Sequence, residues 1–202
     1  MTPGAVRQGS LDGFLARVLE GGVDAVQLRV KELEARPLLR LAEVVRRRTD
    51  EFGALFIVND RVDLAIAAGA DGVHLGQDDL PVATAKALLT ASGLPGALIG
   101  WSTHREQEVL ASREAGVDYI GVGPVHTTPT KPGRAAVGLD LVRFAASRAA
   151  HPFFAIGGVD LATLPSVIEA GARRVAVVRA LTEAEDPGRV ARAMSALLAA
   201  AV

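Results

Sequence analysis

The sequence predicts an α/β fold, a parallel (β/α)8 (TIM) barrel formed by a single domain over residues 1–202. Short apolar runs alternate with longer amphipathic stretches, as in a chain of strand–helix units. Half of the residues are hydrophobic but only 4% are aromatic, so the core is aliphatic, which favours parallel strands buried on both faces. Most apolar runs end in a polar or charged residue, as expected when one rim of a barrel carries the chemistry.

Eight helices are expected from apolar residues at helical spacing. Ser10 is the expected N-cap of the first, over residues 11–20, and Gly21-Gly22 ends it. The second covers residues 35–52, with the arginine run 46–48 on its solvated face. The other six are expected over residues 62–68, 82–92, 105–115, 139–149, 160–169 and 187–200.

Seven strands alternate with these helices. They are expected over residues 23–31, 54–58, 97–101, 118–122, 153–156 and 174–178, with one more inside 70–79. The first strand of a complete barrel is weak or truncated, although residues 5–8 could pair as a short strand. A doubly wound sheet is the alternative, but it usually carries its glycine-rich phosphate loop at the first strand–helix turn. Here the pair Gly157-Gly158 follows a late strand, which favours the barrel.

The composition of the chain indicates which kinds of partner and which cellular location to expect. The formal net charge of −1 does not indicate a nucleic-acid partner. The chain has no cysteine, which excludes disulfides and thiolate metal sites. Residues 1–10 do not resemble a signal peptide, and no apolar run approaches the length of a membrane helix. We therefore expect a cytoplasmic protein without membrane partners, and a homo-oligomer is left open.

Polar residues gather at the ends of the expected strands, and these ends share one rim in a parallel barrel. They are Gln27, Arg29, Lys31, Asn59, Asp60, Asp79, Ser102, Thr128, Thr130, Lys131 and Gly158. Simpler explanations exist for some of them. Arg29 and Lys31 could be surface charges at a sheet edge, and Asp60 could be the N-cap of the following helix.

The chemistry of these residues suits phosphorylated ligands. Asp60 and Asp79 are hard oxygen donors, and two carboxylates with waters and phosphate oxygens are a usual Mg²⁺ arrangement. Arg29, Lys31 and Lys131 add positive charge to hold a diphosphate. Gly157-Gly158 and the backbone near residues 178–179 could hold a second, single phosphate. Two anion sites on one rim predict two phosphorylated substrates and a transfer reaction.

The four histidines show neither metal-ligand spacing nor a Ser-His-Asp arrangement. His74 lies within a strand and is expected to be a hydrogen-bonded core residue. His104 is expected at the surface, where it opens a helix. His126 lies in the loop 121–131 and is more open to a role, which the sequence does not define.

Several motifs together resemble thiamine phosphate synthase, in order from about residue 21 to the C-terminus. They are Q-L-R-V-K at 27–31, V-N-D at 58–60, G-V-H-L-G-Q-D-D at 72–79, G-W-S at 100–102, G-P-V-H-T-T-P-T-K at 123–131 and I-G-G at 156–158. The resemblance implies a (β/α)8 barrel and a Mg²⁺-dependent transferase. Such an enzyme joins hydroxymethylpyrimidine diphosphate to hydroxyethylthiazole phosphate by a dissociative substitution and releases pyrophosphate.

The resemblance also implies roles for individual residues. Asp60 and Asp79 would bind Mg²⁺, and catalytic roles would fall on Arg29, Lys31, Ser102 and Lys131. The pyrimidine diphosphate site would comprise Gln27, Leu28, Arg29, Val30, Lys31, Asn59, Ser102 and Lys131. The thiazole phosphate site would comprise Thr128, Pro129, Thr130, Gly158, Val178 and Arg179.

Three departures from the family pattern stand out. The family's first strand, an L-Y-x-I-T-D-like segment, is not visible before Leu11, so either residues 2–9 form a degraded strand or the natural chain starts further upstream. His126-Thr127 replaces an aromatic-Pro pair. Arg179 stands where the family often has serine, and it could bind phosphate or point outward.

Two other functions compete with the synthase. The related thiazole tautomerase tends to lose the aspartate matching Asp60 and carries a histidine at the position of Pro124, unlike this chain. A non-catalytic ligand-binding barrel is the second alternative, and the complete set of charged rim residues argues against it. Whether the thiazole substrate is carboxylated stays open.

Overall fold

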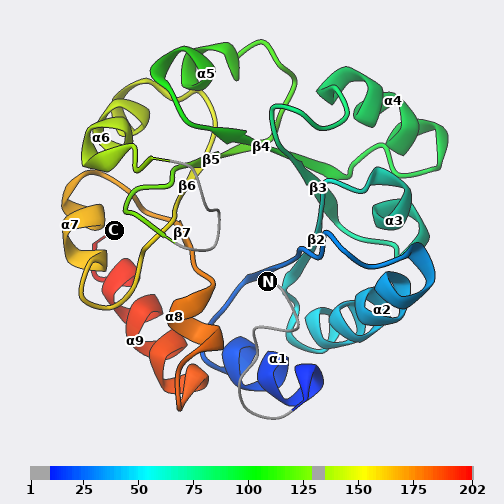
Figure 1. Ribbon diagram of the computed structural model, residues 1–202, viewed down its shortest axis with the longest axis horizontal. Helices are drawn as coiled ribbons and strands as arrows, with labels where there is room; N and C mark the ends of the chain where they lie inside the picture. Colours follow the sequence, from blue (N-terminus) through cyan, green and yellow to red (C-terminus); the bar gives the residue numbers. More distant parts are fainter. Residues whose placement is uncertain (1–9, 129–134, 202) are drawn as a thin grey trace.

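The computed structural model describes residues 10–128 and 135–201. Its described strands form one parallel sheet of seven strands in chain order, curled with the helices on its outer side (Figure 1). The strands are β1 (Ala25–Leu28), β2 (Leu55–Asn59), β3 (Gly72–Leu75), β4 (Leu98–Thr103), β5 (Tyr119–Val122), β6 (Phe153–Ile156) and β7 (Val175–Ala176). The α/β class and the parallel strand order are therefore confirmed, in the form of an open, barrel-like sheet.

All eight expected helices are present in the described part of the chain. The helices are α1 (Leu11–Glu20), α2 (Ala35–Phe52), α3 (Val62–Ala67), α4 (Val82–Ala91), α5 (Glu106–Ala111), α6 (Gly138–Arg148), α7 (Leu164–Glu169), α8 (Arg179–Thr182) and α9 (Pro187–Ala199). The sequence did not predict α8, because four residues are too few to show a helical period. The expected α7 was too long at its start, where Asp160 instead accepts the N–H groups of Ala162 and Thr163 in a turn.

The two ends of the helical ring pack closely, although β7 and β1 are not paired in the described sheet. α9 lies against α1 in Figure 1, and Ser195 of α9 donates to the Gly22 carbonyl at 3.3 Å. A Cβ atom at Gly21 would lie 2.6 Å from the Cβ of Ala191, so this contact requires the glycine that ends α1. The helical layer thus closes around a sheet whose described strands leave two open edges.

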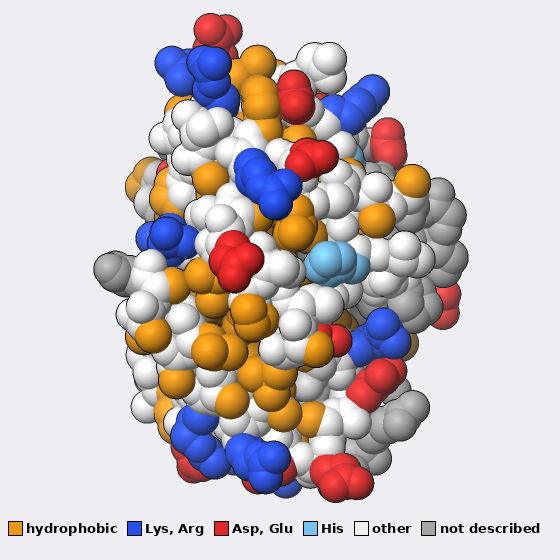
Figure 2. Space-filling view, turned by 90° about the vertical axis from the view of Figure 1, so that its left-hand side faces the viewer, with side chains coloured by type: hydrophobic (Ala, Val, Ile, Leu, Met, Phe, Trp, Pro, Cys, Tyr) orange, Lys and Arg blue, Asp and Glu red, His pale blue; other side chains and the backbone are white. Residues whose placement is uncertain are grey.

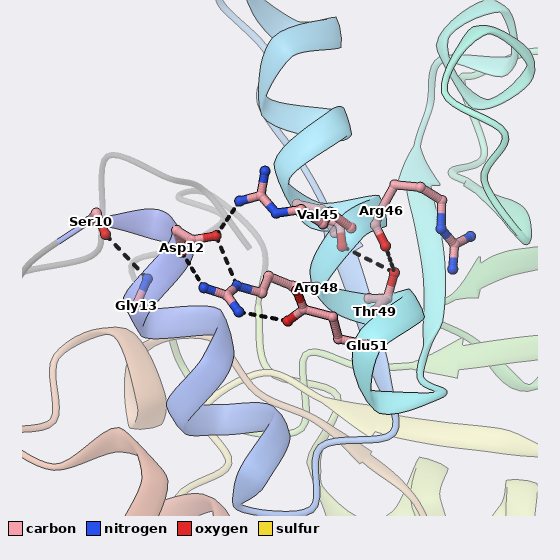
Figure 3. Close-up of polar contacts among 9 residues, drawn as sticks. Ser10, Asp12, Gly13, Val45, Arg46, Arg48, Thr49 and Glu51 are labelled. Atoms are coloured by element: carbon pink, nitrogen blue, oxygen red, sulfur yellow. Dashed lines mark hydrogen bonds and ion pairs between the residues drawn. The ribbon is translucent and has the colours of Figure 1, made fainter.

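The arginine run of α2 joins that helix to α1 (Figure 3). Arg47 Nη2 lies 2.5 Å from Asp12 Oδ1, and Arg48 Nε donates to the same oxygen at 2.8 Å. Arg48 also donates to Glu51 at 2.6 Å. Hydrogen bonds from Arg48 and Arg47 lower the pKa of Asp12 to about 2. The prediction that residues 46–48 form only a solvated face is wrong, since helical spacing does not reveal acidic partners on a neighbouring helix.

Arg46 links α2 to the amino end of the sheet. Its Nη1 donates to Asp71 Oδ2 at 2.9 Å, and the guanidinium lies 5.7 Å from the centre of the Phe56 ring. The same carboxylate oxygen accepts the backbone N–H of Phe56 at 2.6 Å. The Asp71 carboxylate therefore holds α2, β2 and the segment before β3 in place relative to each other.

The outer surface is mixed in character. Figure 2 shows the side of the ring that carries α6, α7 and α9, where charged side chains of both signs are scattered among apolar ones. The core between sheet and helices is aliphatic, with Leu15, Val45, Leu75 and Ile120 fully buried. None of the described helices is long and apolar enough to cross a membrane.

Candidate active site

Two aspartates at the carboxyl end of the sheet, Asp60 and Asp79, form an acid pair. Asp60 follows β2, Asp79 lies between β3 and α4, and both are half-buried. Burial raises the pKa of Asp60 to about 6, and the hydrogen bond and negative charge of Asp79 act in the same direction. The alternative role of Asp60 as a helix cap is not supported, because Arg61 occupies the N-cap position of α3 and no side chain caps it.

Backbone conformation and backbone hydrogen bonds position both side chains of the acid pair. Asp60 adopts a left-handed conformation with φ 64°, and its N–H donates to the carbonyl of His74 at 2.8 Å. Such a conformation is uncommon outside glycine and is tolerated best by Asp and Asn. Asp79 Oδ2 accepts the N–H of Gly76 at 2.6 Å, and a Cβ atom at Gly76 would lie only 2.9 Å from that oxygen. A side chain at Gly76 would therefore displace the Asp79 carboxylate from this position.

Two cations adjoin the acid pair. Lys31 Nζ lies 3.7 Å from Asp60 Oδ2, and the charges of Lys31 and Arg29 both act to lower the pKa of Asp60. The rise in the Asp60 pKa caused by burial and by Asp79 is larger than the decrease caused by these two cations. Both residues were expected inside a strand over residues 23–31, but β1 ends at Leu28 because its pairing with β2 stops there. The Lys31 side chain remains 61% exposed, so it is a surface charge that also reaches the site.

Ser102 lies inside the curled sheet within a polar cluster. It is 8% exposed on β4, and its Oγ lies 2.9 Å from His74 Nε2 on β3. The other ring nitrogen of His74 lies 3.2 Å from the hydroxyl of Tyr119 on β5, and Gln27 of β1 hydrogen-bonds the same phenol. We call Gln27, His74, Ser102 and Tyr119 the interior polar cluster. The expectation that His74 is a hydrogen-bonded core residue is confirmed.

Tyr119 was missed as a site residue, although two glycines could have indicated it. A Cβ atom at Gly100 would lie 2.1 Å from the Tyr119 ring and 2.5 Å from His74 Nδ1. At Gly121 the nearest atom would be His74 Cε1, at 3.3 Å. A glycine inside a strand commonly marks a close approach of another group. These two make room for the rings of the interior polar cluster.

The loops after β5 and β6 meet on the other side of the rim. His126 N–H donates to the Gly157 carbonyl at 2.9 Å, and Gly158 has φ 66°. A Cβ atom at Gly158 would lie 2.6 Å from the His126 Cβ, so the loops require glycine at this crossing. His126 Nε2 is buried with no hydrogen-bond partner within residues 10–128 and 135–201. Thr128 is half-buried in the same loop.

Val178 and Arg179 follow β7, with Val178 half-buried and Arg179 opening α8. Arg179 Nη1 lies 3.9 Å from Glu183 Oε2 on the same short helix, and the arginine side chain is 43% exposed. The structure therefore places this guanidinium beside an acidic neighbour on α8. The carbonyls of both residues accept N–H groups from residues 181–183.

The other predicted residues divide into three groups. Asn59 is the half-buried last residue of β2, beside Asp60. Leu28 and Val30 belong to the hydrophobic core, so any contribution to a substrate site would come from their backbone. Three predicted residues lie outside the described part of the chain: Pro129, Thr130 and Lys131.

The placement expected for His104 was wrong. The residue is half-buried, and its Nδ1 bonds the carbonyl of Gly123 at the end of β5. Its backbone N–H donates to Glu108 Oε2 at 2.6 Å. The adjacent strand end covers the ring, and this is a tertiary contact that a helix-start pattern cannot show.

Comparison with known proteins identifies the family. A family model described as thiamine monophosphate synthase matches residues 2–181. The chain belongs to the thiamine monophosphate synthase family. The family resemblance drawn from the sequence motifs is therefore confirmed.

Relatives of this thiamine monophosphate synthase family member agree over nearly its whole length. A thiamine-phosphate synthase from Acidothermus cellulolyticus is 52% identical over 197 residues, which cover 96% of this chain and 91% of that protein. One from Thermus thermophilus is 49% identical over 193 residues, 95% of this chain and 90% of that protein. These relatives confirm the predicted function, thiamine phosphate synthesis, and the transferase class.

Solved structures give the same result for the fold of this thiamine monophosphate synthase family member. A thiamine phosphate pyrophosphorylase from Pyrococcus furiosus has a TM-score of 0.88 and 31% sequence identity, covering 100% of this chain and 94% of its own. A 3-hexulose-6-phosphate synthase from Salmonella typhimurium has a TM-score of 0.72 at 20% identity, covering 100% of this chain and 96% of its own. The second match shows similarity of fold alone.

Proposed function

We propose that the chain joins hydroxymethylpyrimidine diphosphate to hydroxyethylthiazole phosphate, forming thiamine phosphate and pyrophosphate. The bond between the pyrimidine methylene carbon and the diphosphate oxygen breaks first, and pyrophosphate leaves with the electron pair. The thiazole nitrogen then captures the pyrimidine cation and forms the new C–N bond. The acid pair beside Lys31 and Arg29, at the carboxyl end of a sheet of this family, is the observation that carries the proposal.

The acid pair fits a Mg²⁺ ion. Two half-buried carboxylates interact with each other, and the pKa of Asp60 is raised because its negative charge is disfavoured there. Within the described residues no group of three or more acidic or histidine side chains could form a fuller set of protein ligands. This suits Mg²⁺, which keeps several waters and takes one or two carboxylates together with phosphate oxygens. When bound, Mg²⁺ stabilises negative charge on a diphosphate leaving group.

The chain's own cations complete the diphosphate site. Arg29 and Lys31 lie beside the acid pair, and we propose that Lys131 reaches the same diphosphate. Three positive charges offset the charge that develops on the departing pyrophosphate. Asn59, Gln27 and Ser102 would contact the pyrimidine part, together with the backbone of residues 28 and 30.

The second phosphate is proposed to bind on the opposite side of the rim. Thr128 and Thr130, with Pro129 between them, would face the thiazole phosphate with Gly158 and the backbone of residues 178–179. The close crossing of the loops at Gly158 supports this, because a glycine at that point lets a ligand approach the loop backbone closely. The thiazole nitrogen would then face the pyrimidine held above the acid pair.

We further propose that the single domain over residues 1–202 is a complete (β/α)8 barrel, in which an eighth strand closes the sheet between β7 and β1. Two observations support this: β1 and β7 each have an open edge in the described sheet, and the family model begins at residue 2. Open edges of parallel sheets are normally covered. Protection of the amides of residues 2–9 from hydrogen exchange would test it, and free exchange would contradict it.

We also propose a cytoplasmic location for the protein. Assembly into a homo-oligomer is compatible with the site, whose proposed residues all come from one chain. Sedimentation of the purified protein would measure its assembly state.

The two alternative functions receive less support. The retained Asp60 and Pro124 differ from the pattern expected of the tautomerase. The retained acid pair and its adjoining cations argue against a barrel that only binds a ligand.

Mixing both phosphorylated substrates with and without Mg²⁺ tests the proposal. We expect thiamine phosphate and pyrophosphate in equal amounts, and only when Mg²⁺ is present. Parallel reactions with carboxylated and decarboxylated thiazole phosphate show which form is used. Absence of both products would overturn the synthase, and isomerisation of the carboxylated thiazole without coupling would identify a tautomerase instead.

A further inference from the structure

The interior polar cluster connects four strands through side chains alone. Gln27 of β1 bonds the phenol of Tyr119, the phenol bonds His74 Nδ1, and His74 Nε2 bonds Ser102 Oγ. His74 and Ser102 are 9% and 8% exposed, inside a sheet that is otherwise mostly aliphatic. Buried polar groups of this kind persist only when they are hydrogen-bonded. The backbone of Ser102 is also fixed by a hydrogen bond, because Gln77 Nε2 donates to the Ser102 carbonyl at 2.7 Å.

The neighbouring strands are shaped around this cluster. Gly100 and Gly121 stand where any side chain would collide with Tyr119 or crowd His74. The Tyr119 ring also packs edge-on against Phe154, with centroids 5.4 Å apart. Two glycines and an aromatic contact thus fix the two rings that lead to Ser102.

Two orders of donors and acceptors fit the distances in the cluster, and the tautomer of His74 decides between them. The effect of Gln27 on the pKa of Tyr119 favours the order in which Gln27 donates to the phenol. Burial raises the pKa of Tyr119, so the phenol keeps its proton, while the hydrogen bond from Gln27 acts in the opposite direction, as a donor to the phenol oxygen does. A protonated phenol donates to Nδ1 of a neutral imidazole, which leaves the imidazole proton on Nε2. That proton is donated to Ser102 Oγ, and the Ser102 hydroxyl proton is then free to be donated to another acceptor.

We propose that His74 is a positioning residue that holds Ser102 as a hydrogen-bond donor toward the pyrimidine substrate. Gln27 and Tyr119 act behind it by fixing the imidazole as its Nε2–H tautomer. The inference rests on the proposed function, since it assigns Ser102 to the pyrimidine side of that reaction. It goes further by making the orientation of Ser102 depend on three residues of other strands.

The tautomer can be measured without substrate. Nitrogen-15 NMR of uniformly labelled protein reports which imidazole nitrogen carries the proton, and the His74 signals are assigned by their loss in His74→Gln. We expect the proton on Nε2 at neutral pH, and Tyr119→Phe should weaken that preference. A proton on Nδ1, or an imidazolium cation, would overturn the proposal.

Kinetics separate positioning from folding. His74→Asn keeps an amide group near the Nδ1 position, whose oxygen can accept from Tyr119, but it places no donor near Ser102. We expect kcat to fall about 10²-fold, the scale of a misplaced group. His74→Gln, which places an amide N–H near the Nε2 position, should recover most of that loss. KM for the thiazole phosphate should change little in both variants. Ser112→Ala is the matched control, because Ser112 is fully buried just after α5 and donates to the Val109 carbonyl at 2.7 Å. It should lower Tm but leave kcat unchanged.

A double-mutant cycle with Ser102→Ala gives the decisive result. If His74 acts through Ser102, adding His74→Asn to Ser102→Ala causes no further loss of kcat. Multiplicative losses, or failure of His74→Gln to exceed His74→Asn, would overturn the proposal. If the His74 variants do not fold, Tyr119→Phe decides, and unchanged kcat together with an unchanged tautomer would refute it. A wild-type chain without synthase activity would instead refute the proposed function, while the NMR result would still test the tautomer.

Discussion

Asp12 and Asp60 are both aspartates beside arginine or lysine, yet their surroundings are opposite. Asp12 lies between Arg47 and Arg48 at the junction of α1 and α2, and its pKa is lowered to about 2 (Figure 3). Asp60 is half-buried beside Asp79 at the carboxyl end of the sheet, and its pKa is raised to about 6. The protein stabilises the negative charge of Asp12 through its two arginines, whereas it disfavours the negative charge of Asp60.

This difference distinguishes a structural ion pair from a binding site. A carboxylate that is already matched gains little from a ligand, and its role is to hold two helices together. Asp60 and Asp79 instead place two acidic groups together in a partly buried position, where a bound cation would relieve their repulsion. Strongly shifted groups of this second kind concentrate at functional sites. Four measurements test the comparison.

The largest effect is expected from Asp60→Asn. Turnover should fall by at least about 10²-fold, the scale of losing one electrostatic contact in a transition state. Tm should hold or rise, because the substitution removes repulsion with Asp79. Steady-state kinetics at saturating Mg²⁺ and thermal unfolding measure the two quantities. Unchanged turnover would remove Asp60 from the metal site.

Magnesium should stabilise the wild-type protein through the acid pair. At about 100 times its Kd, a ligand specific to the folded state adds about 2.7 kcal/mol, which raises Tm by several degrees in a chain of this size. Asp79→Asn should abolish most of the rise, and sodium chloride at equal ionic strength is the control. An equal rise in the variant would place the ion elsewhere.

Asp12→Asn should lower Tm at neutral pH and leave kcat unchanged. The folded-state pKa of Asp12, about 2, is below the ordinary aspartate value of 3.8, so its stabilising contribution is present above about pH 4. That contribution is lost as the pH falls toward 2. Thermal unfolding of both proteins over this range should show their Tm difference shrinking. A difference that persists at the acidic end would mean that the ion pairs are not its cause.

The smallest effect is expected from Arg179→Ser. The arginine side chain is 43% exposed and lies beside Glu183, so we expect the KM for thiazole phosphate to stay within about twofold, as for most surface substitutions. Glu183→Gln is the matched control. A clear rise in KM for the arginine variant alone would show that its side chain reaches the phosphate.

The sequence alone determined the order of elements and the positions of the polar strand ends. Hydrophobic periodicity is a local property, so all seven described strands and eight of the helices follow from it, with bounds that differ by a few residues. Because the strands are parallel, the polar residues after them had to share one edge. That rule predicts Lys31, Asp60 and Asp79 at the same edge, and the structure places them there.

Only the tertiary structure decided which side chains meet. A period of two or 3.6 residues gives the face on which a side chain lies, but not its partner on another element, because partners depend on sheet curvature and strand register. The contact of His74 with Tyr119 and Ser102 arises from the pairing of β3, β4 and β5. Arg47 and Arg48 of α2 contact Asp12 for the same reason, through the packing of α1 on α2.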